Sequence, residues 1–221
     1  MKNHTALLAV VLIGGSMSVV AAEDTKRHPA QPEYSADSYI ENEDMKIKEH
    51  IYVGQGKQRK ENDMSGDKVT SIVRPDKGVV WLLMPEDKMV MEMTMQQAQA
   101  HQPSIDLSDY QIERTEVGRE TVNGLETTKY KVMMTAKDGK KLGGFQWIAP
   151  PGIQVKLDAI SKEGDSKERI KMELTNLTIG PQDPKLFEIP ADYTVMTMPA
   201  MPGMMGNPGM RGMMPRGLGQ D

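Results

Sequence analysis

The segment Val79–Met95 constrains the fold more than any other, because it predicts two strands joined by a turn at Pro85–Lys88. On the second predicted strand methionine recurs at every other position, and side chains two residues apart share a face of a sheet. The residues on that face are Met89, Met91, Met93 and Met95. Methionine is flexible and polarizable, and its thioether is also a soft metal ligand. This face therefore has three alternative roles: ordinary core, an adaptable apolar wall of a binding site, or a set of sulfur ligands for a metal.

Most of the chain alternates apolar and polar residues between Gly, Asp and Asn turns, a pattern typical of antiparallel strands. The dipeptide Asn123-Gly124 is a strong hairpin signal. The predicted strands are Tyr34–Glu41, Met45–Val53, Lys57–Asn62, Lys68–Arg74, Gly78–Met84, Met89–Met95, Gln111–Glu120, Leu125–Ala136, Gly144–Ile148, Ile153–Lys162 and Ser166–Ile179. A phase shift in the last strand predicts a bulge near Thr175-Asn176. One short helix is predicted at Gln96–Gln102, before Pro103. The fold class is mainly β, with a curved antiparallel sheet, half-barrel or barrel.

The two ends of the chain differ in composition from the middle. Residues 1–22 have the pattern of a secretory signal peptide, with Lys2, an apolar run at Ala6–Ile13 and small residues at Val20-Ala21-Ala22. We predict a periplasmic protein, with secretion into the medium as the alternative, and no transmembrane segment after signal removal. Residues 23–32 are expected to be a disordered lead-in, residues 33–195 one domain, and residues 196–221 a disordered tail rich in Met, Gly and Pro.

The composition argues against several function classes. Removing the signal peptide removes only Lys2 from 27 basic and 31 acidic residues, so the mature charge is 26 − 31 = −5, which argues against nucleic acid. Cysteine is absent, which excludes disulfides, thiolate metal sites and a cysteine-linked lipid anchor. His28, His50 and His101 are scattered and no catalytic motif accompanies them, so we predict no enzyme and no cofactor.

Several short motifs, in their order along the chain, resemble the periplasmic lipoprotein-carrier (LolA/LolB-like) superfamily, in a branch of uncharacterised domains. They are Val80–Pro85 with Lys88 and Met89, Val122–Gly124 with Lys129-Tyr130, Phe145–Trp147 with Pro150–Ile153, and Asp183–Pro190 with Tyr193. The resemblance implies an open half-barrel of strongly curved antiparallel sheet with one or two short helices, whose concave face holds acyl chains or other apolar ligands. Members of this superfamily carry or sense lipoproteins or lipids. Only one helix is predicted, at Gln96–Gln102, whereas a full lipoprotein carrier has more helices over its sheet. This difference favours a generic lipid-binding or sensing module.

The first functional hypothesis is therefore a groove that binds a lipid or acyl chain. The residues expected to line it are Trp81, Leu83, Met89, Met91, Met93, Met95, Tyr130, Met134 and Trp147. Flexible thioethers and large aromatic rings adapt to varied apolar ligands. Plain core packing of the same residues remains the alternative. A further alternative is a sensing or interaction module whose partner is another envelope protein.

The second hypothesis is soft-metal binding by the tail. Its methionines are Met196, Met198, Met201, Met204, Met205, Met210, Met213 and Met214. On a Gly- and Pro-rich backbone these thioethers can gather around Cu(I) or Ag(I), whereas sulfurs along one strand lie ~7 Å apart and do not converge by themselves. A tail without a ligand, or one that consumes oxidants, is the alternative.

Overall fold

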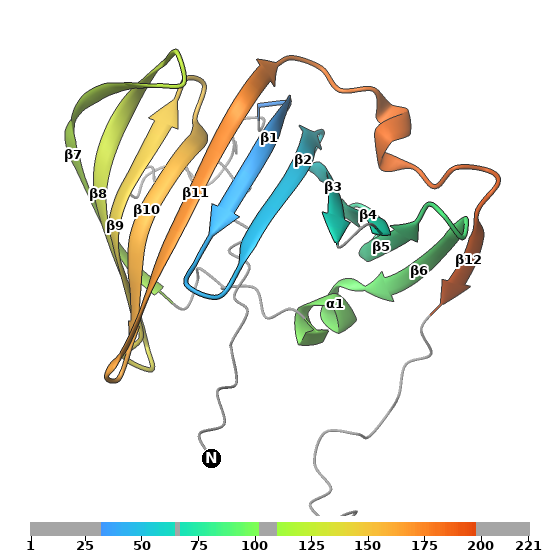
Figure 1. Cartoon of the computed structure of the whole chain (residues 1–221), viewed down its shortest axis with the longest axis horizontal. Helices are drawn as coiled ribbons and strands as arrows, with labels where there is room; N and C mark the ends of the chain where they lie inside the picture. The colour runs from blue at the N-terminus through green and yellow to red at the C-terminus, as the bar shows by residue number, and fades with distance from the viewer. Residues whose placement is uncertain (1–31, 65–66, 102–109, 198–221) are drawn as a thin grey trace, which may run out of the picture.

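The computed structural model describes residues 32–64, 67–101 and 110–197, which form a single 12-stranded sheet (Figure 1). The elements are β1 Tyr34–Glu41, β2 Lys46–Gly54, β3 Lys57–Met64, β4 Asp67–Arg74, β5 Val79–Met84, β6 Met89–Thr94, α1 Met95–His101, β7 Tyr110–Val122, β8 Leu125–Ala136, β9 Lys141–Ala149, β10 Ile153–Glu163, β11 Ser166–Ile179, the 3₁₀ helix η2 Pro184–Phe187 and β12 Thr194–Thr197. The strand order is β12-β6-β5-β4-β3-β2-β1-β11-β10-β9-β8-β7. The predicted class, a mainly β protein with an open curved sheet, is confirmed.

Two meanders make up the sheet, and the pairing of β1 with β11 joins them. Every neighbouring pair is antiparallel except β12, which runs parallel to β6. The strands β7 and β12 are the two edges, so the sheet does not close into a barrel. No helix among the described residues has both the length and the apolarity to cross a bilayer.

Chain length forces this sheet to curve. The strands β6 and β7 follow each other in sequence but lie ten steps apart in strand order, which is ~48 Å across a flat sheet. Between them α1 has seven residues and rises ~10 Å. The nine Cα-to-Cα steps from His101 to Tyr110 add at most ~32 Å. The connection is therefore too short for a flat sheet, and the curvature seen in Figure 1 follows from it.

The predicted strands agree with the structure apart from their ends, the placement of Met95 and the two unpredicted elements η2 and β12. The bulge is confirmed, since β1 and β11 shift register opposite Asn176, which has φ 51°. Met95 begins α1 and does not extend β6, so its predicted place in the strand is wrong. The elements η2 and β12 were not predicted. Met196 and Thr197, which were predicted to lie in a disordered tail, belong to β12. The signal peptide, most of the lead-in and the tail from residue 198 lie outside the described residues.

The two faces of β1–β6 are named here by their side chains. The methionine face carries Met89, Met91 and Met93, and the tryptophan face carries Trp81, because cross-strand partners share a face and neighbours in sequence alternate. On the methionine face Tyr34, Ala36, Ile51 and Val53 belong to the largest apolar cluster. Burial raises the pKa of Tyr34 to about 12. A second cluster lies on the tryptophan face around Phe187. A third, around Val132 and Leu157, holds the long strands together.

The segment after β11 is anchored on the tryptophan face. Phe187 of η2 is 2% exposed and packs with Ile72, Trp81, Leu83 and Val90. Arg74, which is 3% exposed, donates to Phe187 O at 2.8 Å and to Glu188 Oε1 at 2.7 Å. It also donates in a bidentate manner to Asp76, at 2.9 and 2.8 Å. This buried guanidinium is therefore neutralised by two carboxylates and fixes η2 over the sheet.

Gly144 is required by close packing within the sheet. A Cβ added there would collide with the backbone O of Asp158 and approach Ala159 Cα to 2.5 Å. We therefore expect Gly144→Ala to lower the free energy of unfolding by ~1–3 kcal/mol in urea denaturation. The matched control is Gly143→Ala, whose Cβ meets the flexible end of Met133, with Cε at 2.9 Å. An equal loss in both variants would contradict this explanation.

The Arg74–Asp76 pair predicts a pH dependence of stability. The hydrogen bonds from Arg74 lower the pKa of Asp76 to about 2. The unfolded carboxyl has a pKa of ~3.9, so the stabilisation is complete above that value and is lost as pH falls toward 2. Compared with the wild type, Asp76→Asn should be less stable at neutral pH, and the difference should shrink toward zero as pH falls to about 2. Urea denaturation at a series of pH values measures it. A difference independent of pH would show that the charge of Asp76 contributes nothing.

Candidate functional site

Half-buried apolar side chains gather on the methionine face of β5 and β6. Met84 pairs with Met89, Leu82 with Met91, and Val80 with Met93. All six are of intermediate exposure, unlike Trp81, Leu83 and Val90 on the opposite face, which are buried. The local reason is the period of two in both strands, which sends apolar residues to both faces. The structure thus gathers three of the four predicted methionines into one surface, here called the methionine patch and made of these six residues.

A charged pair lies on the same face, beside the methionine patch. Lys60 Nζ is 3.3 Å from Glu49 Oε1, and their side chains are 12% and 8% exposed. Lys60 pairs across the strands with Ile51 on one side and Ser71 on the other, and Ser71 pairs with Leu82. The pair therefore separates the largest apolar cluster from the methionine patch. Removing two opposite charges from water is costly, and contact between them offsets part of this cost.

The polar character of this region extends to the cross-strand neighbours of Glu49. Ser38, 5% exposed, and Asn62 both pair with Glu49 and face the same way. Asn62 Oδ1 is buried and accepts no hydrogen bond from any described residue. A buried acceptor without a partner costs free energy, so this oxygen can receive a hydrogen bond from a ligand or a water molecule.

Trp81 and Leu83 lie on the tryptophan face, so their predicted grouping with Met91 and Met93 in one wall is wrong. Trp81 is the cross-strand partner of Glu92, and its Nε1 donates to Glu92 Oε2 at 2.8 Å. The cationic groups of Arg74 and Lys77 lie 5.4 and 4.9 Å from the centre of its ring. Both residues are sealed beneath Phe187 as ordinary core. Strand alternation alone separates Trp81 from Met91, but the sequence motif suggested one aromatic and thioether wall.

Of the other predicted groove residues, Tyr130, Met134 and Trp147 lie on the long strands β8 and β9, and Met95 begins α1. Tyr130 continues the methionine face through a cross-strand row with Leu157, Met172 and Ile40. The guanidinium of Arg114 lies 3.5 Å from the centre of the Tyr130 ring. Met134, 6% exposed, is packed in the third apolar cluster. Met95, in α1, is 39% exposed. These residues therefore do not form one compact site with Met91.

Trp147 lies on the face of β8 and β9 opposite Tyr130. It is 7% exposed, and its Nε1 donates to Glu120 Oε2 at 2.6 Å. The ammonium groups of Lys129 and Lys156 lie 4.9 and 5.3 Å from the centre of its ring. Trp147 thus has a structural hydrogen bond and two cation–π contacts, which identify it as core with a charged rim.

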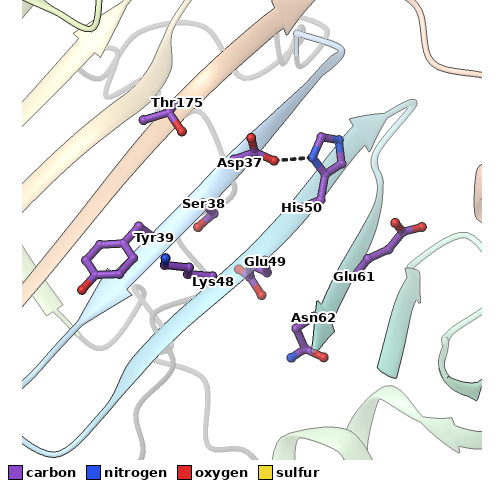
Figure 2. A pocket seen from close by; sticks show the side chains of 9 residues that line it. All are labelled: Asp37, Ser38, Tyr39, Lys48, Glu49, His50, Glu61, Asn62 and Thr175. Atoms are coloured by element: carbon purple, nitrogen blue, oxygen red, sulfur yellow. Dashed lines mark hydrogen bonds and ion pairs between the residues drawn. The ribbon is translucent and has the colours of Figure 1, made fainter. Parts of the chain in front are cut away.

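A polar pocket of about 440 Å³ lies on β1–β3 (Figure 2). It is lined by Asp37, Ser38, Tyr39, Lys48, Glu49, His50, Glu61, Asn62 and Thr175. None of the predicted groove residues is among them. Sequence reasoning missed this pocket, because Asp37 and His50 meet only once the β1–β2 register is known. The period of two in both strands was the one available signal.

The centre of the pocket is the pair Asp37–His50. His50 Nδ1 is 2.6 Å from Asp37 Oδ1, and Asn176 donates to Asp37 Oδ2 at 2.6 Å. The hydrogen bonds from Asn176 and His50 lower the pKa of Asp37. The His50 ring also packs edge-on against Tyr52, with 4.7 Å between centroids. This arrangement can hold a polar group by hydrogen bonding.

The pocket has the acid and base of a catalytic triad but not its nucleophile at the expected place. Ser38 follows Asp37 directly, yet its cross-strand partner is Glu49 and no hydrogen bond joins it to His50 among the described residues. Within the part of the chain that the structure describes, no group of three or more His, Asp or Glu residues is placed to hold a metal ion.

A family model, the domain of unknown function DUF4412, matches residues 38–143. No curated protein sequence matches the chain. Among solved structures, an uncharacterized conserved protein from Thermus thermophilus is 10% identical, with a TM-score of 0.48, over 75% of this chain and 90% of that one. MucB in the MucA/MucB complex of Pseudomonas aeruginosa is 15% identical, with a TM-score of 0.48 over 76% of this chain.

The chain covers only 59% of that MucB structure. The lipoprotein LppX of Mycobacterium tuberculosis is 13% identical, with a TM-score of 0.38, over 65% of this chain and 85% of that one. At these identities the likeness concerns the fold alone. These proteins share the LolA-like fold, the fold that the sequence resemblance predicts.

Proposed function

We propose that this protein is a non-enzymatic binding protein of the bacterial periplasm that holds an apolar ligand, a lipid or an acyl chain, on its methionine face. The observation that carries the proposal is the methionine patch: six apolar side chains of β5 and β6 on one face, all of them only half buried. The tryptophan face of the same two strands is sealed by Phe187. The two faces of one hairpin therefore differ in how far their apolar side chains remain open to a ligand.

The chemistry of the patch suits a ligand of variable shape. Three of its six side chains are supplied by β6 and are methionines, and Met84 adds a fourth thioether from β5. Unbranched thioethers change rotamer at low cost and fit chains of differing curvature. Burial of apolar surface contributes ~25 cal/mol per Å², so affinity here depends on contact area more than on specific bonds.

Lys60, Glu49 and Asn62 provide a polar end for the same ligand. An acyl chain along Leu82 and Met91 would place its head group near Ser71 and Lys60, because these residues follow one another across β6, β5, β4 and β3. The Lys60–Glu49 pair is already neutral overall, which favours a zwitterionic or uncharged polar head group. The free acceptor at Asn62 Oδ1 would take a hydrogen bond from a hydroxyl or amide of that group.

The proposal that the protein is not an enzyme is supported by the surroundings of the Asp37–His50 pair. His50 binds Asp37 in the polar pocket, while Ser38 is the cross-strand partner of Glu49 and not of His50. The chain also lacks cysteine, the other common nucleophile that a histidine activates. Binding of an apolar ligand on the methionine face requires neither a nucleophile nor a histidine that activates it.

The proposal predicts selective loss of ligand binding from the methionine patch. In titrations with a dansyl-labelled long-chain fatty acid, the double variant Leu82→Gln/Met91→Gln should bind at least tenfold more weakly than the wild type. Burial of two such side chains is worth more than the ~1.4 kcal/mol of a tenfold change in Kd.

The matched control for this experiment is Ile160→Gln. Ile160 is 49% exposed and alternates with the buried Ala159, so a polar substitution there leaves the methionine face intact. The control should bind as the wild type does. Absence of fatty-acid uptake by the wild type, or unchanged binding by the double variant, would overturn the proposal.

A further inference from the structure

We propose that the sheet edge formed by β6 and β12 is a thioether site for a soft monovalent cation, Cu(I) or Ag(I), with Met91 and Met196 as its central pair and Met89 or Met93 as the third ligand. The inference does not rest on the proposed lipid-binding function. It moves the predicted metal site from the tail to a structured part of the chain.

Strand register places these methionines on neighbouring strands of one face. β12 runs parallel to β6, with Met196 opposite Met91 and Thr194 opposite Met89. Register partners on neighbouring strands point to the same face and lie ~4.8 Å apart. Met89 and Met93 are each two residues from Met91, so both are diagonal neighbours of Met196 at ~7–8 Å between Cα atoms, within reach of long side chains. The thioethers along one strand are too far apart to bind the same ion. The neighbouring strand β12 adds a thioether beside them.

The four side chains are also accessible. Met196 is 41% exposed, while Met89, Met91 and Met93 are half buried. β12 is an edge strand, as its position beside β6 in Figure 1 shows, so one side of the site opens away from the sheet. Within the described residues these exposures leave the four side chains open to a cation from solvent, and Leu82 and Val80 lie beside Met91 and Met93 on the other side.

Ligand softness decides which cation fits. Thioethers are neutral, soft donors that select Cu(I) and discriminate against hard cations such as Mg²⁺ and Ca²⁺, which require oxygen. Ag(I) has the same preference and does not change oxidation state in air-saturated buffer, so it serves as the probe. Thioethers have no proton to lose near neutral pH, and binding should therefore be nearly independent of pH between 5 and 8, unlike binding by histidine or thiolate.

The two candidate locations can be separated in the full-length protein. A background variant replaces the seven tail methionines beyond β12 by leucine; these are Met198, Met201, Met204, Met205, Met210, Met213 and Met214. Ag(I) is titrated by calorimetry against this background and against the same protein carrying Met91→Leu and Met196→Leu. Leucine conserves volume and apolarity and removes only the sulfur.

The background variant should bind one Ag(I) per chain, and the added Met91→Leu/Met196→Leu pair should weaken this binding at least tenfold. The matched control adds Met133→Leu instead, since Met133 of β8 is 38% exposed and lies far from β12 in strand order. It should leave the affinity unchanged. Loss of all binding in the background variant would overturn the proposal and return the site to the tail. Equal effects of the control and the pair would also overturn it.

A second measurement does not depend on any variant. With ¹³C-methyl-labelled methionine in the wild-type protein, the first equivalent of Ag(I) should shift the methyl resonances of Met91 and Met196 together with that of Met89 or Met93. The methyl of Met134, which is packed in the third cluster, should not move. Shifts confined to tail methionines at the first equivalent would contradict the site.

Discussion

The pairing of β1 with β11 is the interaction on which the rest of the structure depends. It is the only junction between the meander β1–β6 and the meander β7–β11 in the strand order. Side chains reinforce it from both strands: Asn176 binds Asp37, and Asn42 donates to Glu168 at 2.7 Å. With this pairing in place, the short connection from β6 to β7 can be made only if the sheet curves. Curvature is thus a consequence of topology and chain length.

Local periodicity predicted the fold well because the strands of each meander pair with their neighbours in sequence. The alternation along β11 even located the bulge at Asn176. It failed for β12, whose four residues TVMT are all exposed and pair with a strand about a hundred positions earlier. The ends of β9 were also missed, since Gly143-Gly144 has the composition of a turn, whereas these glycines make room for Met133 and Ala159. The register between strands distant in sequence, and close packing between strands, cannot be predicted from the alternation of residues within one strand.

The same distinction explains the candidate site. The methionine face could be predicted, because alternation within β6 fixes it. The separation of Trp81 from that face follows from the same rule, yet a short motif made an aromatic and thioether wall attractive. Neither the Lys60–Glu49 pair nor the Asp37–His50 pocket could be predicted, since each needs the register of a hairpin. The sealing of the tryptophan face depends on Phe187 and Arg74, which lie 113 positions apart.

The two proposed ligands of the methionine face are thermodynamically linked. Met91 belongs both to the apolar patch and to the thioether edge, so an ion bound by Met91 and Met196 fixes a side chain whose freedom lets the patch adapt to an acyl chain. Whatever change in affinity the ion causes for the acyl chain, the acyl chain must cause for the ion. Because a bound cation places a positive charge at the apolar end of the patch, the sign of this coupling is unfavourable for an acyl tail. The proposed apolar ligand and the proposed soft cation would therefore compete for the methionine face, although no polar residue belongs to both sites.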